Sequence, residues 1–143
     1  MRLVYLLLIA FMFTACQSET ETKEAAPEPA TLSEKIDQLI EADEYEEALT
    51  LLEAEEVSEE ILGLQEKTHL NYGLFIIYNS DPSKMRENAN NGLRQFIKVL
   101  DINRGNDKAV SEIEQIMGIY ATFPDRGPDE DVMEDLRRLG FNY

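Results

Sequence analysis

The chain has one cysteine, one histidine and no tryptophan among its 143 residues. A single cysteine cannot close a disulfide within the chain, and structural zinc sites take about four Cys or His ligands. Basic residues are also scarce, because 13 Lys and Arg face 29 Asp and Glu, for a formal net charge of −16 at pH 7. We therefore expect no zinc site, and no nucleic acid among the partners of so acidic a chain.

Long apolar runs are missing as well. The run LVYLLLIAFMF at residues 3–13 has eleven residues, whereas a helix that crosses a bilayer needs about 20. It follows the basic Arg2 and leads into Thr14, Ala15 and Cys16. A positive start, a short apolar segment and small residues before a cut are typical of a secretory signal peptide.

These residues resemble the signal of bacterial lipoproteins, in which the cysteine at the cut is lipidated and becomes the first mature residue. The resemblance implies a signal peptide at residues 1–15 and acyl chains on Cys16 that hold the protein at a lipid bilayer. Two acyl chains already give stable anchoring. Phe13 stands where the usual motif has Leu, a departure common in the Bacteroidetes group. The alternative is an ordinary secretory signal followed by an unrelated cysteine.

Residues 16–30 form the next segment, which has no large apolar side chain, four glutamates and two prolines. Such a composition cannot bury enough surface to offset chain entropy, so we expect a disordered acidic stalk after the lipidated cysteine. Its residues 18–21, Ser-Glu-Thr-Glu, resemble the acidic export tag of surface lipoproteins in the same group. That resemblance implies the bacterial outer membrane, on its periplasmic or its surface face.

Residues 31–143 have the size of one domain and a helical pattern throughout. No stretch alternates apolar and polar residues as a strand does. Thr31 with Glu34 forms a capping box, and Ser58 can cap a later helix. We expect an all-α fold of about six helices, whose starts and stops are indicated by Thr31, Asp43, Ser58, Tyr78, Asp81-Pro82, Gly105, Asp107, Asp129 and Gly140.

Three segments resemble parts of the tetratricopeptide repeat: residues 42–53, 71–76 and 92–102. The resemblance implies antiparallel helical hairpins stacked as a short right-handed array. Small residues at Ala48 and Gly92 would let paired helices approach closely. They are 44 residues apart, whereas the repeat period is about 34. An irregular helical bundle is the alternative.

In such an array the first helix of each repeat lines a concave groove, which the resemblance implies would bind a peptide or helix of a partner. The last helix could instead close that groove. The register carries five residues of this chain onto the groove face: Asp37, Lys67, Leu74, Tyr78 and Gln115.

Candidate chemistry is sparse elsewhere. His69 lies beside apolar residues, where a hydrogen-bonded core position is favoured over a catalytic base. Residues 101–112 carry part of a calcium-loop pattern, but Gly105 stands where an oxygen ligand is needed, which favours a turn. Three asparagines at positions 88, 90 and 91 interrupt a helical pattern that asparagine disfavours. They could line a groove that hydrogen-bonds a peptide backbone, or form a solvated face.

We therefore expect no catalytic residues, no metal and no cofactor. The favoured function is a non-catalytic adaptor or scaffold module, anchored in the cell envelope through Cys16, that binds a protein or peptide. The alternative is a structural envelope lipoprotein without a peptide groove. In that case the acidic stretch at residues 34–60, with twelve acids and one lysine, would act as a spacer or contact surface.

Overall fold

The computed structural model describes residues 30–123 and 125–143. The expected signal peptide at residues 1–15, Cys16 and all but the last residue of the expected stalk lie outside the described residues. The described part is all-helical and contains no strand, which confirms the expected all-α class. Its elements are α1 Leu32–Glu41, α2 Tyr45–Glu53, α3 Glu59–Asn79, the short 3-10 helix η1 Pro82–Lys84, α4 Met85–Ile102, α5 Asp107–Tyr120 and α6 Glu130–Leu139.

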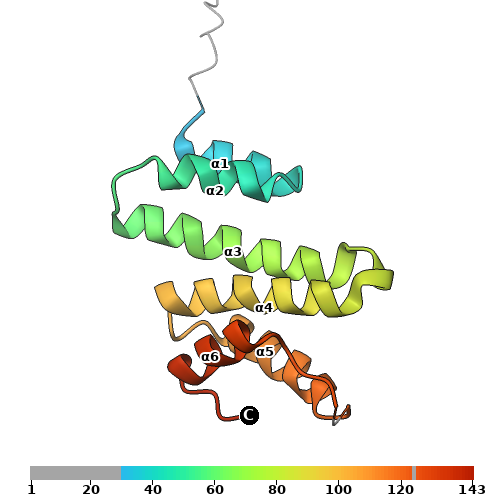
Figure 1. The fold of residues 1–143 in the computed structure, drawn as a ribbon. Helices are drawn as coiled ribbons and strands as arrows, with labels where there is room; N and C mark the ends of the chain where they lie inside the picture. The colour runs from blue at the N-terminus through green and yellow to red at the C-terminus, as the bar shows by residue number, and fades with distance from the viewer. Residues whose placement is uncertain (1–29, 124) are drawn as a thin grey trace, which may run out of the picture.

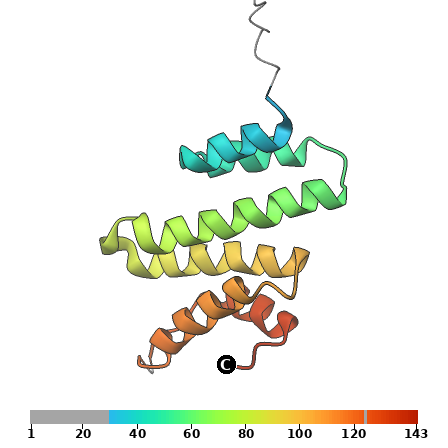
Figure 2. The same cartoon turned by 180° about the vertical axis from the view of Figure 1, so that it is seen from behind.

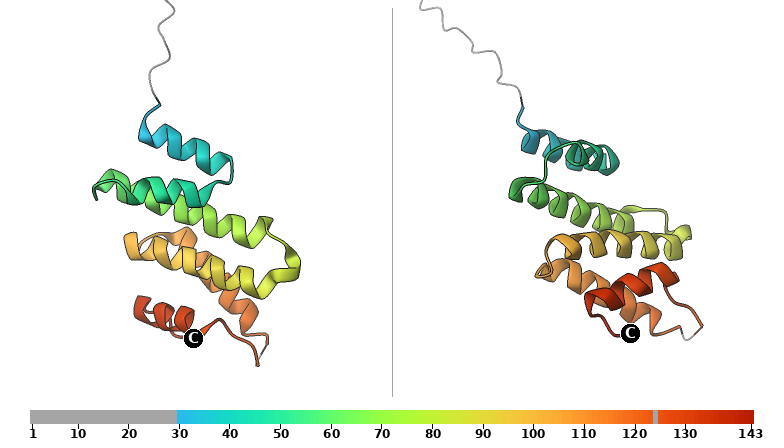
Figure 3. Two further views of the ribbon diagram at one scale, coloured as in Figure 1. Left: turned by 45° about the horizontal axis from the view of Figure 1, so that its top comes forward. Right: turned by 60° about the vertical axis from the view of Figure 1, so that its left-hand side comes forward.

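The helices are stacked in chain order (Figure 1). The pair α1 and α2 forms one end, the long antiparallel hairpin of α3 and α4 forms the middle, and α5 and α6 form the other end, as the reverse view in Figure 2 also shows. The two further views in Figure 3 show the same layering. Within the described ranges, no helix has both the length and the apolar character that crossing a bilayer requires.

Two apolar clusters hold the stack together. One joins α1, α2 and the first half of α3 around Ile36, Ala48 and Leu52, all fully buried. The larger one joins α4, α5 and α6 around Phe96 and Leu136. The second half of α3 packs against this larger cluster, so α3 belongs to both and links them.

The hairpin of α3 and α4 depends on two glycines. A Cβ atom added at Gly73 would lie 2.6 Å from Cε1 of Phe96, whose side chain is fully buried. A Cβ atom at Gly92 would lie 2.6 Å from Cδ1 of Ile77. Both helices therefore approach closely only because side chains are absent at these positions. The expected role of Gly92 in close approach is confirmed.

Local capping sets two helix starts and one helix end as expected. Glu34 N donates to Thr31 Oγ1 at 3.2 Å while Thr31 N donates to the Glu34 carboxylate at 2.7 Å, which completes the capping box. Ser58 accepts a hydrogen bond of 3.2 Å from Ile61 N at the start of α3. Gly140 ends α6 in the left-handed region at φ 98°, which glycine adopts at little cost.

Asp43 and Asp107 were expected at helix starts, and α5 does begin at Asp107, but neither carboxylate caps its helix. Asp43 does not cap α2, because its backbone is left-handed at φ 60° and its carboxylate accepts from Tyr45 Oη instead. Asp107 does not cap α5, because Asn106 one residue earlier accepts from Ala109 N at 2.9 Å. A short polar side chain can serve either the helix end or a neighbouring group, and in both cases here a residue close in sequence takes the alternative.

The expected helix start at Asp81-Pro82 is a single 3-10 turn. Asp81 Oδ1 accepts from Ser83 N at 2.9 Å, and the regular helix α4 begins only at Met85.

Candidate functional site

The five predicted groove residues lie on α1, α3 and α5, and the structure brings four of them together in two pairs. Lys67 Nζ forms an ion pair of 2.6 Å with Asp37 Oδ1, which joins α3 to α1. Gln115 Nε2 donates a hydrogen bond of 3.4 Å to Tyr78 Oη, which joins α5 to α3. Lys67 and Tyr78 are eleven positions apart on α3, about 16 Å along the helix axis. The two pairs therefore mark the two ends of one helical face.

Leu74, the fifth predicted residue, lies between them on α3 and is partly buried against the larger apolar cluster. It therefore contributes more to the core than to an exposed groove. Lys67 and Tyr78 remain accessible, with 48% of the Lys67 side chain and 55% of Tyr78 exposed.

Tyr78 also covers a buried carboxylate. Its hydroxyl donates a hydrogen bond of 2.8 Å to Oε2 of Glu112, whose side chain is only 3% exposed. Lys108, one turn earlier on α5, contacts the other oxygen of that carboxylate at 2.5 Å. The hydrogen bond to Glu112, followed by burial, raises the pKa of Tyr78, and the same carboxylate raises the pKa of Lys108. The hydroxyl and the ammonium thus stay protonated and compensate the buried charge.

The last helix, α6, packs against α4. Arg94 of α4 binds Asp131 at 2.8 Å and Asp129 at 3.1 Å, and Arg138 of α6 binds Asp101 of α4 at 2.6 Å. The side chain of Asn90, 3% exposed, accepts a hydrogen bond of 2.8 Å from the backbone N–H of Asp129. These contacts orient α6 on α4, whereas the two pairs described above join α1, α3 and α5.

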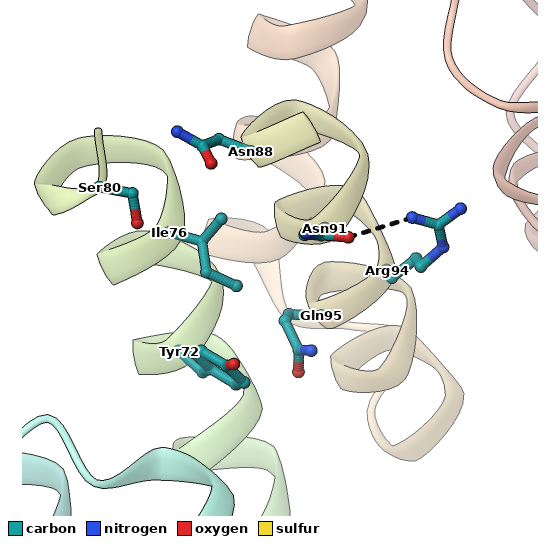
Figure 4. A pocket seen from close by; sticks show the side chains of 7 residues that line it. All are labelled: Tyr72, Ile76, Ser80, Asn88, Asn91, Arg94 and Gln95. Atoms are coloured by element: carbon teal, nitrogen blue, oxygen red, sulfur yellow. Dashed lines mark hydrogen bonds between the residues drawn. The ribbon is translucent and has the colours of Figure 1, made fainter. Parts of the chain in front are cut away.

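An open hollow of about 340 Å³ lies between α3 and α4 (Figure 4). We call it the amide hollow. One row of its lining comes from α3 and the residue after it, and the other row comes from α4, as Figure 4 shows. The lining residues are Tyr72, Ile76, Ser80, Asn88, Asn91, Arg94 and Gln95. The asparagine cluster was the only signal for this hollow in the sequence.

The three asparagines of that cluster have different roles in the structure. Asn90 is buried and fixes the start of α6, whereas Asn88 and Asn91 are half-buried and line the amide hollow. Asn88 Nδ2 donates to Asp81 O at 2.9 Å, and Asn91 Oδ1 accepts from Arg94 Nη1 at 3.2 Å. The expected solvated face is therefore wrong for Asn90.

A second hollow of about 520 Å³ adjoins the first and is lined by residues 43–47, Tyr72 and Phe75. We call it the acidic hollow, since four of these residues are Asp or Glu. The rings of Tyr45 and Tyr72 stack with centroids 5.0 Å apart and planes at 8°. Burial, followed by the hydrogen bond to Asp43, raises the pKa of Tyr45 to about 12. Tyr72 lines both hollows, so the two meet at this side chain.

His69 lies between α3 and α4, with Nδ1 at 2.8 Å from Gln95 Oε1. Burial lowers its pKa, which favours the neutral ring. This placement agrees with the expected hydrogen-bonded position rather than with a base in a catalytic constellation.

Residues 101–112, which carry part of a calcium-loop pattern, use their polar side chains to contact other helices. Asp101 pairs with Arg138, while Asn103 and Asn106 both donate to Glu66 Oε1, at 2.9 Å and 2.7 Å. In the described part of the chain no group of three or more His, Cys, Asp or Glu side chains could hold a metal ion. The segment serves as the turn between α4 and α5.

Comparisons with protein-family models, with curated proteins and with solved structures found no match to this chain.

Proposed function

We propose that this chain is a lipid-anchored lipoprotein of the cell envelope that serves as a non-catalytic protein-interaction module. Its anchor would be the acylated Cys16, in the outer membrane, and its binding part would be the helical domain. In this proposal α1 and α3 act as the first helices of two tetratricopeptide-like hairpins, α2 and α4 as their second helices, and α5 as the first helix of a partial third repeat.

One observation carries the proposal: the face formed by α1, α3 and α5 keeps accessible side chains while α6 is tied to α4. Lys67 and Tyr78 are about half exposed, and Gln115 is exposed. A helix that filled the groove would bury these residues. The contacts of α1 with α3 and of α2 with α3 also support a stacked array.

The alternative is a structural envelope lipoprotein without a specific peptide groove. The acidic stretch at residues 34–60, which includes most of α1 and all of α2, favours this alternative because a strongly charged surface keeps a domain soluble and repels anionic neighbours. This alternative predicts that no single substitution on the α1, α3 and α5 face removes a partner.

Affinity capture from solubilised envelope separates the two functions. We expect wild type to capture a defined partner that is lost with Lys67→Glu and weakened with Tyr78→Ala. Lys35→Glu makes the same charge change on α1, two positions from Asp37, and should retain the partner. Identical capture by all four proteins would contradict the groove and favour the structural alternative.

A further inference from the structure

The amide hollow contains hydrogen-bonding groups that its own helices leave unused. Asn91 and Gln95 each use their oxygen, toward Arg94 and His69, and Asn88 uses its nitrogen, toward Asp81. Toward the described residues, Asn88 Oδ1, Asn91 Nδ2 and Gln95 Nε2 make no hydrogen bond within range. The hollow therefore offers one acceptor followed by two donors along α4.

The spacing of these groups matches an extended peptide. Asn91 and Gln95 are about 6 Å apart along the helix axis, at 1.5 Å per residue. One edge of an extended chain repeats every second residue, about 6.6 Å. On that edge each residue presents its N–H and its C=O together. The N–H of one peptide residue could thus donate to Asn88 Oδ1. The C=O of the same peptide residue could accept from Asn91 Nδ2, and the C=O two residues further along the peptide could accept from Gln95 Nε2.

The helix itself loses stability by having asparagine at these positions. Asn costs about 0.5 kcal/mol more than Ala in a helix interior. The hydrogen bond from the backbone N–H of Asp129, at the start of α6, to the Asn90 side chain offsets this loss of helix stability. Asn88 and Asn91 contribute no comparable contact between the packed helices, which points to a use in the hollow.

The acidic hollow lies at the Gln95 end of this row, because α4 runs antiparallel to α3 and Tyr72 lines both hollows. Its carboxylates are Asp43, Glu44, Glu46 and Glu47. None of the ion pairs among the described residues involves any of the four. A basic side chain at that place would meet carboxylates that pair with no cation among the described residues, beside the rings of Tyr72 and Phe75. The carboxylates of Asp43 and Glu46 accept hydrogen bonds only from the hydroxyls of Tyr45 and Tyr72 in this part of the chain.

We propose that the amide hollow and the acidic hollow together bind an extended peptide, with its backbone on Asn88, Asn91 and Gln95 and a Lys or Arg side chain against residues 43–47. This site is separate from the α1, α3 and α5 face and does not rest on the function proposed above.

Fluorescence anisotropy with the full chain in detergent micelles tests this site. The probes are labelled nine-residue peptides of Ala, Ser and Thr that end in two arginines. Matched probes carry two glutamates instead, or N-methyl groups on the central backbone amides. We expect the arginine probe to bind, the glutamate probe to bind at least tenfold more weakly, and N-methylation to weaken binding about tenfold.

Variants distinguish this site from general attraction of a basic peptide to an acidic protein. Asn91→Leu and Gln95→Leu should each weaken the arginine probe several-fold, because they remove donors to the peptide C=O groups. Asn88→Leu should remove the sensitivity to N-methylation, because Asn88 Oδ1 is the acceptor of the peptide N–H. Glu46→Gln with Glu47→Gln should weaken it more than Glu59→Gln with Glu60→Gln, which removes the same charge at the start of α3. Equal binding of the N-methylated probe, or equal loss with both pairs, would overturn the proposal.

A measurement on the unmutated protein covers the case in which a variant fails to fold. In ¹⁵N-labelled chain, the side-chain NH₂ signals of Asn91 and Gln95 should shift when the arginine probe is added, while those of Gln38 on α1 should not. Absence of a selective shift at saturating probe would overturn the proposal.

Discussion

The Tyr78 hydroxyl of α3 donates a hydrogen bond of 2.8 Å to the Glu112 carboxylate of α5, whose side chain is 3% exposed. This contact spans 34 residues of sequence and connects the middle of the stack to its C-terminal end. It also means that Tyr78, a predicted groove residue, stabilises the fold as well as presenting an exposed ring.

Removing that hydroxyl should therefore destabilise the domain. With Tyr78→Phe the Glu112 carboxylate keeps Lys108 as its one side-chain partner among the described residues. We therefore expect a loss of about 1 kcal/mol in the free energy of unfolding, measured by urea denaturation. Tyr143→Phe is the matched control, because Tyr143 is similarly exposed at 52% and its hydroxyl makes no hydrogen bond to a described residue within range. Equal stability of the two variants would show that Lys108 alone compensates the carboxylate.

The close approach of α3 and α4 predicts opposite effects of two Gly→Ala substitutions. Gly73→Ala would place Cβ 2.6 Å from the buried Phe96 ring, so we expect a loss of about 1–3 kcal/mol from overpacking. Gly63→Ala, in the same helix, meets nothing within 4 Å and should stabilise by about 0.5–1 kcal/mol through helix propensity. Thermal unfolding of both variants measures this difference. Stabilisation by Gly73→Ala would mean that Phe96 can shift without loss.

Stability should fall at high pH, in part through Tyr45. Its pKa is raised from the ordinary 10.0 to about 12, mainly by burial and then by the hydrogen bond to Asp43. The folded state holds the proton of the Tyr45 hydroxyl more tightly than the unfolded chain does. The stabilisation that this hydroxyl gives to the folded state is therefore complete below about pH 10 and is lost as the pH rises toward about 12.

A two-unit shift corresponds to at most about 2–3 kcal/mol. We expect the free energy of unfolding of wild type to decline over this range more steeply than that of Tyr45→Phe, with urea denaturation at several pH values as the measurement. Lys108 and Tyr78 titrate in the same direction and remain in both proteins. Parallel curves would mean that Tyr45 contributes nothing to the decline.

The proposed anchor predicts that the sulfur atom of Cys16 is acylated. Wild type should incorporate palmitate in metabolic labelling and sediment with membranes, whereas Cys16→Ser should do neither, because anchoring would then depend on the short signal alone. Ser18→Ala, two residues away, is the control and should behave as wild type. A Cys16→Ser variant that stays fully in the membrane fraction, or wild type without label, would contradict a lipid anchor.

Much of the helical architecture could be predicted from short-range patterns. Thr31 with Glu34, Ser58 and Gly140 each act within one helical turn of their own position, so their roles depend on neighbouring residues alone. Asp43 and Asp107 failed as caps because an equally suitable partner or residue lay next to them.

The site was harder to predict. The asparagine cluster drew attention to α4, yet nothing in its spacing separated the buried Asn90 from Asn88 and Asn91. Tyr72 of the amide hollow and residues 43–47 of the acidic hollow come from separate helices. Their proximity follows from packing of α2 on α3, which the sequence does not encode in any local window.

The sequence alone determined that residues 31–143 form a helical domain with short connections, because caps and apolar stripes act over a few residues. Only the tertiary structure decided that α6 lies against α4, that Lys67 pairs with Asp37, and that Tyr78 covers Glu112. These contacts join residues about 30 or more positions apart. They exist only where packing of the whole stack brings the two helices together, since each side chain alone would be equally well solvated by water.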